Sequence, residues 1–424
     1  MPAYIGSPLG PHATRVLVLG GGELGKGLAK SFQNLGLEVH VADRYEGAPA
    51  QQVAHFSYTI DFDDPTAVLE LAHQVKPHYI VPEIENISSE ALQVLASDTP
   101  AMVVPTARAC DLTSDRKKQR ETAESLGLPT SAYRFVESFA ALEEAVAELD
   151  VPCIIKPDAQ TSGRGHVLVK DKEQLADAWM AITRGTDQRV VVEQFVDFDY
   201  EVTILAVRSI DPATGELATW FSEVIGYEHQ QGNLVESWQP APMSPRAFEN
   251  ARSVAARISN ELGGRGVYAV ELFVAGDDVY FSSVTPRPSD KAMLTVYTQR
   301  YSQYDLHARA ILGLPIDVTL ISPGAACVLH ASEYLDEVAF YGLEDAMRMA
   351  ETDVRIFGKT SAYPGRRMGL VGATANDIAE ARDRAALAHS RIRVGAVPAE
   401  EQPTPEPERA PVSAIESVDT SVRG

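Results

Sequence analysis

The stretch Val151-Pro152-Cys153-Ile154-Ile155-Lys156-Pro157, with the loop Thr161-Ser162-Gly163-Arg164-Gly165-His166 behind it, decides how this chain folds. A short apolar strand ends in a lysine and leads into glycines and small hydroxyl side chains. Such residues let consecutive backbone N–H groups close over an anion, and Arg164 adds positive charge. The motif is not a Walker A loop, which has Gly-Lys-Ser/Thr at the start of a helix. It therefore predicts a phosphate site of another type, with Lys156 as a phosphate ligand.

A second segment, Tyr268 to Pro288, predicts a β-hairpin with a carboxylate on its inward face. Two β-rich runs flank the turn sequence Gly276-Asp277-Asp278, and this turn places Glu271 opposite Ser283. An acid on an apolar strand is costly to bury unless it is paired or coordinates a metal. Magnesium is commonly held between phosphates and one or two carboxylates. We therefore predict a metal site at Glu271, the alternative being that Glu271 lies on a solvated face.

The composition is that of a globular protein. The chain has 424 residues, 45% of them hydrophobic, which is enough for two or three domains with substantial cores. An excess of 59 acidic over 37 basic residues argues against a nucleic-acid or membrane-surface partner. The 3 cysteines are widely spaced, which fits a reduced, cytoplasmic protein. We expect neither secretion nor a membrane span, because the chain has no signal-peptide pattern and no long apolar run.

Hydrophobic periodicity divides the chain into three folded parts and a tail. Residues 1–115 alternate strands and helices and predict a doubly wound α/β domain, whereas residues 116–325 predict an α+β domain. Residues 326–395 predict a small strand-and-helix domain. The tail 396–424 is rich in Pro, Glu, Ser and Thr, which predicts disorder. The clearest expected elements are strands at 16–19, 37–42 and 78–81, and helices at 24–35, 65–75, 116–126 with Asp115 as N-cap, and 375–390.

The motif Gly20-x-Gly22-x-x-Gly25 follows a strand and opens a helix, as in dinucleotide-binding folds. Asp43 stands where such folds place a ribose-binding acid, so an NAD-dependent oxidoreductase is one alternative. Glu23, however, would repel a pyrophosphate from this loop. A loop with N–H donors and one carboxylate better matches a ligand that has both phosphate and ammonium groups. A structural alternative is that the glycines only allow close packing of strand against helix.

Four longer motifs carry a resemblance to a known family: Gly22-Glu23-Leu24-Gly25-Lys26, Pro77-His78-Tyr79-Ile80-Val81-Pro82-Glu83-Ile84-Glu85, Glu236-Ser237-Trp238-Gln239-Pro240 and Arg355-Ile356-Phe357-Gly358-Lys359. From residue 8 to 395 the chain resembles the formate-dependent phosphoribosylglycinamide formyltransferases of the ATP-grasp superfamily. The resemblance implies a pre-ATP-grasp domain, an ATP-grasp domain and a small C-terminal domain, in a homodimer. It also implies ATP and magnesium as cofactors, and formate and glycinamide ribonucleotide as substrates that react through formyl phosphate.

The resemblance further implies a role for each matching residue. Arg116, Lys156 and the loop Thr161 to His166 would hold the ATP phosphates, Glu193, Gln194, Phe195 and Val196 the adenine, and Glu201 the ribose. Glu23, Leu24, Glu83, Asp290, Lys359, Arg366 and Arg367 would hold the ribonucleotide. Carboxylates suit its amine, and an arginine pair suits its phosphate because guanidinium groups bind phosphate bidentately. The candidate catalytic residues are Lys156, Glu271 and Asp290, and the candidate metal ligands are Glu271 and Ser283.

Three departures from the family pattern lie near the predicted metal and acceptor sites. The family hairpin has two opposed glutamates, whereas this chain has Ser283 at the second position, and a neutral hydroxyl is a poor magnesium ligand. The family sequence His-Asp-Thr-Gly is replaced by Ser289-Asp290-Lys291-Ala292, and a His-Arg-Gln pattern by Tyr227-Glu228-His229. Three interpretations follow: a working formyltransferase, an ATP-dependent ligase for another carboxylate or amine, and a non-catalytic nucleotide-binding protein.

Overall fold

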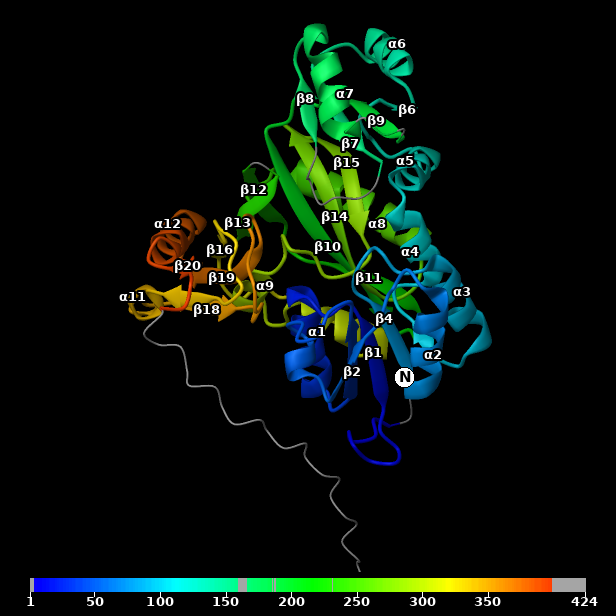
Figure 1. Ribbon diagram of the computed structural model, residues 1–424, viewed down its shortest axis with the longest axis vertical. Coiled ribbons are helices and arrows are strands. Elements are labelled where there is room, and N and C mark those ends of the chain that lie inside the picture. Colours follow the sequence, from blue (N-terminus) through cyan, green and yellow to red (C-terminus); the bar gives the residue numbers. More distant parts are fainter. Residues whose placement is uncertain (1–3, 159–165, 185, 187, 231, 399–424) are drawn as a thin grey trace, which may run out of the picture.

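A computed structural model describes residues 4–158, 166–184, 186, 188–230 and 232–398. Figure 1 shows an N-terminal part in blue, a small sheet with two helices at the top, and a long sheet that continues into the C-terminal strands. The predicted combination of an α/β part with α+β parts is confirmed. The loop 161–165 and the tail beyond residue 398 lie outside the described residues. Within the described part of the chain, no helix is both long and apolar enough to cross a membrane.

The N-terminal part is a parallel sheet, with strand order β3-β2-β1-β4-β5 among the described residues. Alternate residues of a strand point to opposite faces. Val16 and Val18 accordingly pack in a cluster with Phe32 of α1, whereas Leu17 and Leu19 pack in another cluster with α2 and α3. The elements are β1 (Arg15–Leu19), α1 (Glu23–Asn34), β2 (Glu38–Asp43), β3 (Phe56–Thr59), α2 (Pro65–Val75), β4 (Tyr79–Pro82), α3 (Ser89–Asp98), β5 (Met102–Val103) and α4 (Ala107–Ser114).

Short polar residues start the helices close to where the sequence predicts. Asp64 accepts a hydrogen bond from the backbone N–H of Thr66 at 2.9 Å, and α2 covers the predicted range. Asp115 caps α5 (Arg116–Ser125) by accepting from the N–H of Lys118 at 3.0 Å, as predicted. Helix α12 begins at Ile378 rather than at residue 375, because Asp377 is its N-cap.

The order of the N-terminal sheet reverses between β1 and β4, with β2 and β3 on one side and β5 on the other. Loops that follow two such strands diverge, so a crevice opens at the carboxyl ends of the strands, where ligands of α/β sheets bind. The loop Gly20 to Gly22 follows β1 and leads to Glu23, and Glu83 directly follows β4. The fold therefore brings these two predicted substrate-binding carboxylates to one crevice.

A small antiparallel sheet, in the order β6-β9-β7-β8, carries Lys156. Cys153 and Ile155 of β7 pack in a cluster with α6 and α7. Ile154 and Lys156 alternate with them and therefore face the other side of the sheet. The elements are β6 (Tyr133–Val136), α6 (Phe139–Leu149), β7 (Cys153–Pro157), β8 (Val167–Val169), α7 (Leu175–Thr183) and β9 (Val190–Gln194).

The long sheet has the order β15-β14-β10-β12-β13-β16-β19-β18, and β11 pairs with β10. Helix α10 joins it to the N-terminal sheet, because Leu306 packs in a cluster with the long sheet and Ile311 in a cluster with β1 and β2. The elements are β10 (Tyr200–Ile210), β11 (Leu217–Phe221), β12 (Ile225–Gln230), β13 (Asn233–Gln239), α8 (Pro245–Leu262), β14 (Gly266–Ala275), β15 (Asp278–Thr285), α9 (Thr295–Thr298), α10 (Gln303–Leu312), β16 (Gly324–His330), β18 (Thr352–Ile356) and β19 (Arg367–Thr374).

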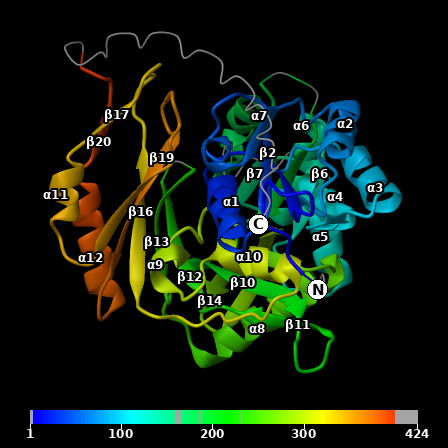
Figure 2. The same ribbon diagram turned by 90° about the horizontal axis from the view of Figure 1, so that it is seen from below.

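The C-terminal strands extend this sheet. β16 pairs with β13 on one side and with β19 on the other, so residue 325 lies within a strand shared by both regions. Helix α12 covers these strands through Ala381 and Ala385, and Figure 2 shows α12 and α11 at the outer side. The remaining elements are β17 (Ala339–Tyr341), α11 (Leu343–Met347), α12 (Ile378–His389) and β20 (Arg393–Gly395).

Candidate active site

Most of the predicted site residues meet in one cavity of about 480 Å³ between the N-terminal crevice, the β14–β15 hairpin and the small sheet. The predicted residues that line it are Glu23, Leu24, Glu83, Arg116, Lys156, His166, Phe195, Glu201, Glu271, Ser283, Asp290 and Arg367. The other predicted residues within the described part of the chain do not line it: Glu193, Gln194, Val196, Lys359 and Arg366. Two of them contact its lining, because Glu193 pairs with Lys156 and Lys359 with Glu23.

Lys156 is held in place by a buried carboxylate. Its Nζ donates to Oε2 of Glu193 at 2.6 Å, and Arg120 donates to Oε1 of the same glutamate at 2.8 Å. Burial alone would raise the pKa of Glu193, but Arg120 and Lys156 hold it well below its usual range. Burial lowers the pKa of Lys156. The side chain of Glu193, predicted to contact adenine, therefore points to Lys156 and Arg120 and positions the lysine.

Arg116 is a buried cation with an unused donor. The residue is 7% exposed, and its Nε has no hydrogen-bond partner among the described residues. A buried donor without a partner costs about 1–3 kcal/mol, so an acceptor supplied by a ligand is favourable here. Lys156 lines the same cavity. The pair supports the prediction that ATP phosphates bind at this end, where His166 also lies.

Aromatic side chains line the cavity near the small sheet. Phe198 stacks on Phe273 with ring centroids 4.7 Å apart and an interplanar angle of 18°. Phe195, which follows β9, lies 6.1 Å from Phe198 between ring centroids. Ile154 and Leu168 line the same cavity. Aromatic and apolar side chains of this kind are suited to packing against a purine base.

Glu201, the predicted ribose ligand, lines the cavity from β10. Burial and the nearby charge of Glu271 raise its pKa to about 7. A carboxyl group with this pKa is half protonated near neutral pH, so it both donates and accepts hydrogen bonds. This capacity suits the two hydroxyl groups of a ribose.

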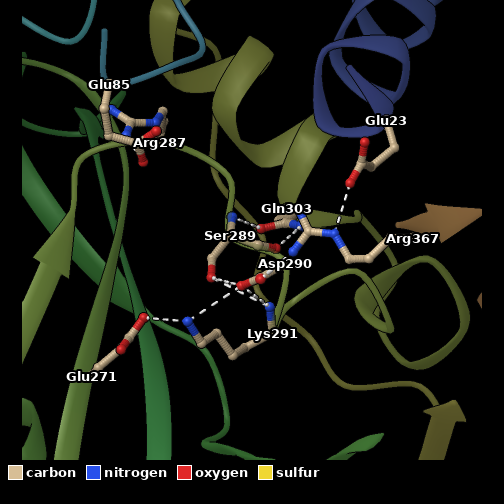
Figure 3. Close-up of polar contacts among 9 residues, drawn as sticks. All are labelled: Glu23, Glu85, Glu271, Arg287, Ser289, Asp290, Lys291, Gln303 and Arg367. Atoms are coloured by element: carbon tan, nitrogen blue, oxygen red, sulfur yellow. Dashed lines mark hydrogen bonds and ion pairs between the residues drawn. The ribbon is translucent and has the colours of Figure 1, made fainter. Parts of the chain in front are cut away.

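The predicted hairpin and its register are confirmed, because Glu271 of β14 pairs with Ser283 of β15. A third residue, Lys291, reaches the same place from the loop after β15. Its Nζ lies 2.8 Å from Oε1 of Glu271 and 3.3 Å from Oδ1 of Asp290, as Figure 3 shows. Glu271 is therefore not solvated but is neutralised by a buried ammonium group.

This arrangement does not fit a divalent cation held by Glu271 and Ser283. Magnesium takes oxygen ligands in near-octahedral geometry, and Ser283 offers a neutral hydroxyl. One carboxylate oxygen of Glu271, Oε1, already lies 2.8 Å from the ammonium of Lys291. Across the described ranges, no group of three or more His, Cys, Asp and Glu side chains is arranged to hold a metal. Of the two predicted ligands, Glu271 thus forms an ion pair with Lys291, and Ser283 supplies a neutral hydroxyl, a set that does not fit a protein-held divalent ion.

A chain of alternating charges runs from the hairpin to the N-terminal crevice (Figure 3). Lys291 contacts Asp290, and Asp290 pairs with Arg367. The Nε of Arg367 also donates to Glu23 at 2.8 Å, and Lys359 pairs with Glu23 at 2.8 Å. Burial alone would raise the pKa of Glu23, but Arg367 and Lys359 lower it to about 2. Two of the three predicted amine ligands, Asp290 and Glu23, therefore already have cationic partners.

Glu83 has no such partner. It is 4% exposed, and neither carboxyl oxygen has a hydrogen-bond partner among the described residues. Burial raises the pKa of Glu83 well above its usual range, although Arg287 acts in the opposite direction. A buried carboxyl of this kind is poised to bind a cation that a ligand brings. Glu83 is therefore the strongest candidate to receive an amine.

Arg287 was not predicted as a site residue. It is 5% exposed, lines the cavity and pairs with Glu85. The signal in the sequence is its place between Pro286 and Pro288 directly after β15, since flanking prolines fix the backbone.

The two adjacent arginines separate. Arg367 opens β19 and enters the cavity. Arg366 donates to the backbone oxygen and the hydroxyl of Ser361 at 2.9 Å each, and its guanidinium lies 5.3 Å from the ring centroid of Tyr363. The contacts of Arg366 are thus with neutral groups, whereas Arg367 is paired with carboxylates.

Known proteins are similar to this chain over most of its length. A formate-dependent phosphoribosylglycinamide formyltransferase from Corynebacterium glutamicum is 53% identical over 398 residues, covering 93% of this chain and 98% of the relative. The protein of the same name from Rhodococcus jostii is 49% identical and covers 92% of this chain and 98% of the relative.

The chain belongs to the formate-dependent phosphoribosylglycinamide formyltransferase family.

Family models match three regions of this formyltransferase family member. They are the ribonucleotide synthetase preATP-grasp domain at residues 13–113, the ATP-grasp domain at 121–304, and a model described as PurT, C-terminal, at 324–392. A solved structure of glycinamide-RNase-transformylase T from Mycobacterium tuberculosis is 36% identical, has a TM-score of 0.76, and covers 89% of this chain and 100% of that chain. The ADP complex of an N5-carboxyaminoimidazole ribonucleotide synthetase is 26% identical, with a TM-score of 0.80 over 91% of this chain and 98% of that chain.

Membership of the formyltransferase family excludes the oxidoreductase alternative, and the glycine motif has a structural explanation. Asp43 accepts a hydrogen bond from the N–H of Gly21 at 2.6 Å and so stabilises the loop itself. A Cβ at Gly25 would lie 2.2 Å from the backbone oxygen of Gly20. The glycines thus let α1 begin close to β1 and bring Glu23 into the crevice.

Proposed function

We propose that this protein transfers a formyl group from formate to the amine of glycinamide ribonucleotide, with ATP converted to ADP and phosphate as part of purine biosynthesis. The observation that supports this most strongly is the pair of unsatisfied groups in one cavity. Among the residues that the structure describes, Arg116 has a buried donor without an acceptor, and Glu83 has two buried oxygens without a donor. An anion at the first and an amine at the second would satisfy both.

In the first step, a formate oxygen attacks the γ-phosphorus of ATP, and the bond from that phosphorus to the ADP oxygen breaks. Lys156 and Arg116 would hold the phosphates, and the stacked Phe198 and Phe273 would hold adenine. Catalysis of phosphoryl transfer consists mainly of positioning and charge stabilisation, which fixed buried cations supply. Glu193 fixes Lys156 for this role through the 2.6 Å hydrogen bond.

In the second step, the acceptor amine attacks the carbon of formyl phosphate. A C–N bond forms, the C–O bond to the phosphate breaks, and phosphate leaves with the electron pair. The amine must lose a proton, and the carboxylate of Glu83, which lines the cavity, would receive it. A desolvated carboxylate is a strong base once a bound cation favours its ionised form.

The phosphate of the ribonucleotide would bind near Arg366, whose guanidinium has neutral partners and therefore keeps its charge available. Lys359 lies 2.8 Å from Glu23 and would contribute a second positive charge. Leu24 and Glu23 begin α1, and backbone N–H groups at a helix N-terminus favour an anion.

A purified preparation tests this directly. ADP release should require ATP, formate and glycinamide ribonucleotide together, and the product should be the formylated ribonucleotide. Release that does not change when formate is omitted would refute the proposal. Glu90→Gln, at an exposed position of α3, is a control variant that should keep full activity.

A second candidate is ligation of a different amine. Asp290 is already paired with Lys291 and Arg367, so the acceptor end of the cavity offers fewer free carboxylates than its composition suggests. Turnover of another small amine with a higher kcat/KM than glycinamide ribonucleotide would favour this candidate.

Several features complete the proposal. Residues 1–115, 116–325 and 326–395 would be the three domains, in a cytoplasmic homodimer that binds small molecules rather than nucleic acid or membranes. The net charge of −22 supports the last point. Mg²⁺ would accompany ATP, held chiefly by phosphate oxygens and water, since this ion readily keeps several waters.

A further inference from the structure

The hairpin position where the sequence predicts a metal is occupied by an ammonium group. Lys291 is the donor: its Nζ lies 2.8 Å from Glu271 and 3.3 Å from Asp290, and its side chain is 9% exposed. We propose that Lys291 takes the place of a protein-held divalent cation at Glu271. The site would then need only the metal ion that arrives with the nucleotide. This inference rests on the proposed use of ATP.

The loop that carries Lys291 is clamped in place. The N–H of Ser289 donates to Oε1 of Gln303 at 2.8 Å, and Nε2 of Gln303 donates back to the oxygen of Ser289 at 2.8 Å. Gln303 is fully buried. The backbone N–H of Lys291 donates to Oδ1 of Asp290 at 2.9 Å. Because the backbone is held on both sides of Asp290, the ammonium group of Lys291 has a fixed position in the site (Figure 3).

The aromatic face of Tyr227 adds a further contact. The Nζ of Lys291 lies 5.7 Å from the centroid of this ring, a distance at which a cation is attracted by the ring electrons. Tyr227 is itself buried. The ammonium of Lys291 thus lies among Glu271, Asp290 and an aromatic face, which together compensate for its removal from water.

The groups around Glu271 can supply positive charge to the site, but they are poorly suited to coordinating a metal ion. Ser283 provides a neutral hydroxyl opposite Glu271. A divalent ion bound to the other oxygen of Glu271 would lie beside the ammonium of Lys291, and like charges repel strongly in a buried site. A lysine supplies a fixed positive charge there without any metal.

Substitutions at Ser283 and Lys291 can each change the charge of the site by the same amount. Replacing Ser283 with glutamate adds one negative charge, and replacing Lys291 with threonine removes one positive charge. The double variant S283E/K291T therefore differs from the natural chain by two charges, which is the charge of one divalent cation. It recreates a pair of carboxylates facing each other across the hairpin, where a metal ion has two anionic ligands.

Counting bound Mn²⁺ tests the inference. The full chain is titrated with Mn²⁺ in the presence of saturating ADP, and free Mn²⁺ is measured by electron paramagnetic resonance. We expect about one tight Mn²⁺ per natural chain and one more in S283E/K291T. Two tight ions in the natural chain, or no additional ion in the double variant, would overturn the inference. K170T, at an exposed lysine, is the matched control and should bind as the natural chain does.

A second measurement needs no nucleotide. Mn²⁺ should raise the melting temperature of S283E/K291T and leave that of the natural chain unchanged; an equal rise in both would contradict the inference. Neither measurement requires formate or an acceptor. A protein with one Mn²⁺ that fails to formylate glycinamide ribonucleotide would refute only the proposed function, and an active enzyme with two would refute only this inference. Failure to bind ADP would refute both.

Discussion

Glu23 and Glu83 follow the neighbouring parallel strands β1 and β4, yet their carboxyl groups lie in opposite electrostatic environments. Burial alone would raise the pKa of Glu23, but Arg367 and Lys359 lower it to about 2. Burial raises the pKa of Glu83 well above its usual range. When two carboxyl groups in one site are driven apart in this way, they take different roles. We therefore expect Glu83, and not Glu23, to exchange a proton with the acceptor amine.

Glu83→Gln keeps the shape of the side chain and removes its ability to take a proton. We predict that kcat/KM for the acceptor falls by about 100-fold or more, the usual contribution of a general base. The affinity for ATP should not change, because the nucleotide end of the cavity is intact. Steady-state kinetics and calorimetric titration with ATP measure the two quantities. A loss of ATP affinity as large as the loss of kcat/KM would mean that the substitution disturbs the structure of the whole cavity, and would contradict a specific role of Glu83 in proton transfer.

The same carboxyl should make stability depend on pH. Because its pKa is raised in the folded state, the folded protein binds a proton that the unfolded chain releases above its usual value of 4.5. The stability that this group contributes is therefore present at low pH and is lost as pH rises above 4.5 toward the raised value. We predict that Glu83→Gln raises the urea midpoint more at pH 8 than at pH 5. An equal shift at both pH values would show that Glu83 is ionised in the free protein.

Lys156→Ala should abolish measurable ATP binding and also destabilise the fold. The variant leaves Glu193 buried with Arg120 as its remaining charged partner, and removing one member of a buried ion pair costs about 3 kcal/mol or more. Urea unfolding and calorimetric titration with ATP check the two effects. Lys170→Ala, at an exposed position, is the control and should change neither. ATP affinity that stays at the natural level would remove Lys156 from the site.

The two adjacent arginines should have separable effects. Arg366→Ala should raise KM for the ribonucleotide about tenfold, the typical loss when a charged hydrogen bond is removed, with little change in stability. Arg367→Ala should also destabilise the protein, because Glu23 and Asp290 each lose a partner. The expected loss is about 2 kcal/mol, less than for a fully buried pair, because the side chain of Arg367 is 29% exposed. Kinetics and urea unfolding of both variants measure this. Equal losses of stability would contradict the separation.

Local patterns predict much of the fold. The alternation of apolar residues and the turn at Gly276 and Asp277 fix the hairpin register, so Glu271 is found opposite Ser283 as predicted. Short polar residues fix helix starts, as at Asp115. The family resemblance also points to the residues that line the cavity, including Glu83, Arg116 and Glu201.

Partners set by tertiary structure are not predictable in this way. Lys291 meets Glu271 because the loop after β15 turns back to the hairpin, and this turn depends on Gln303 of α10. Glu193 binds Lys156 because β7 and β9 are neighbours in the small sheet, and local sequence does not predict the order of strands in a sheet. Arg287 was not predicted because its partner, Glu85, follows β4 of the N-terminal sheet and is distant from Arg287 in sequence.

The central claim is that formate is activated by ATP and then transferred to an amine. The most direct measurement uses formate labelled with ¹⁸O, together with ATP and glycinamide ribonucleotide, and mass spectrometry of the phosphate released. Formyl transfer through formyl phosphate predicts one ¹⁸O atom in each phosphate, because the bridging oxygen comes from formate. Phosphate without the label would show that water, and not formate, attacks ATP, and would contradict the account.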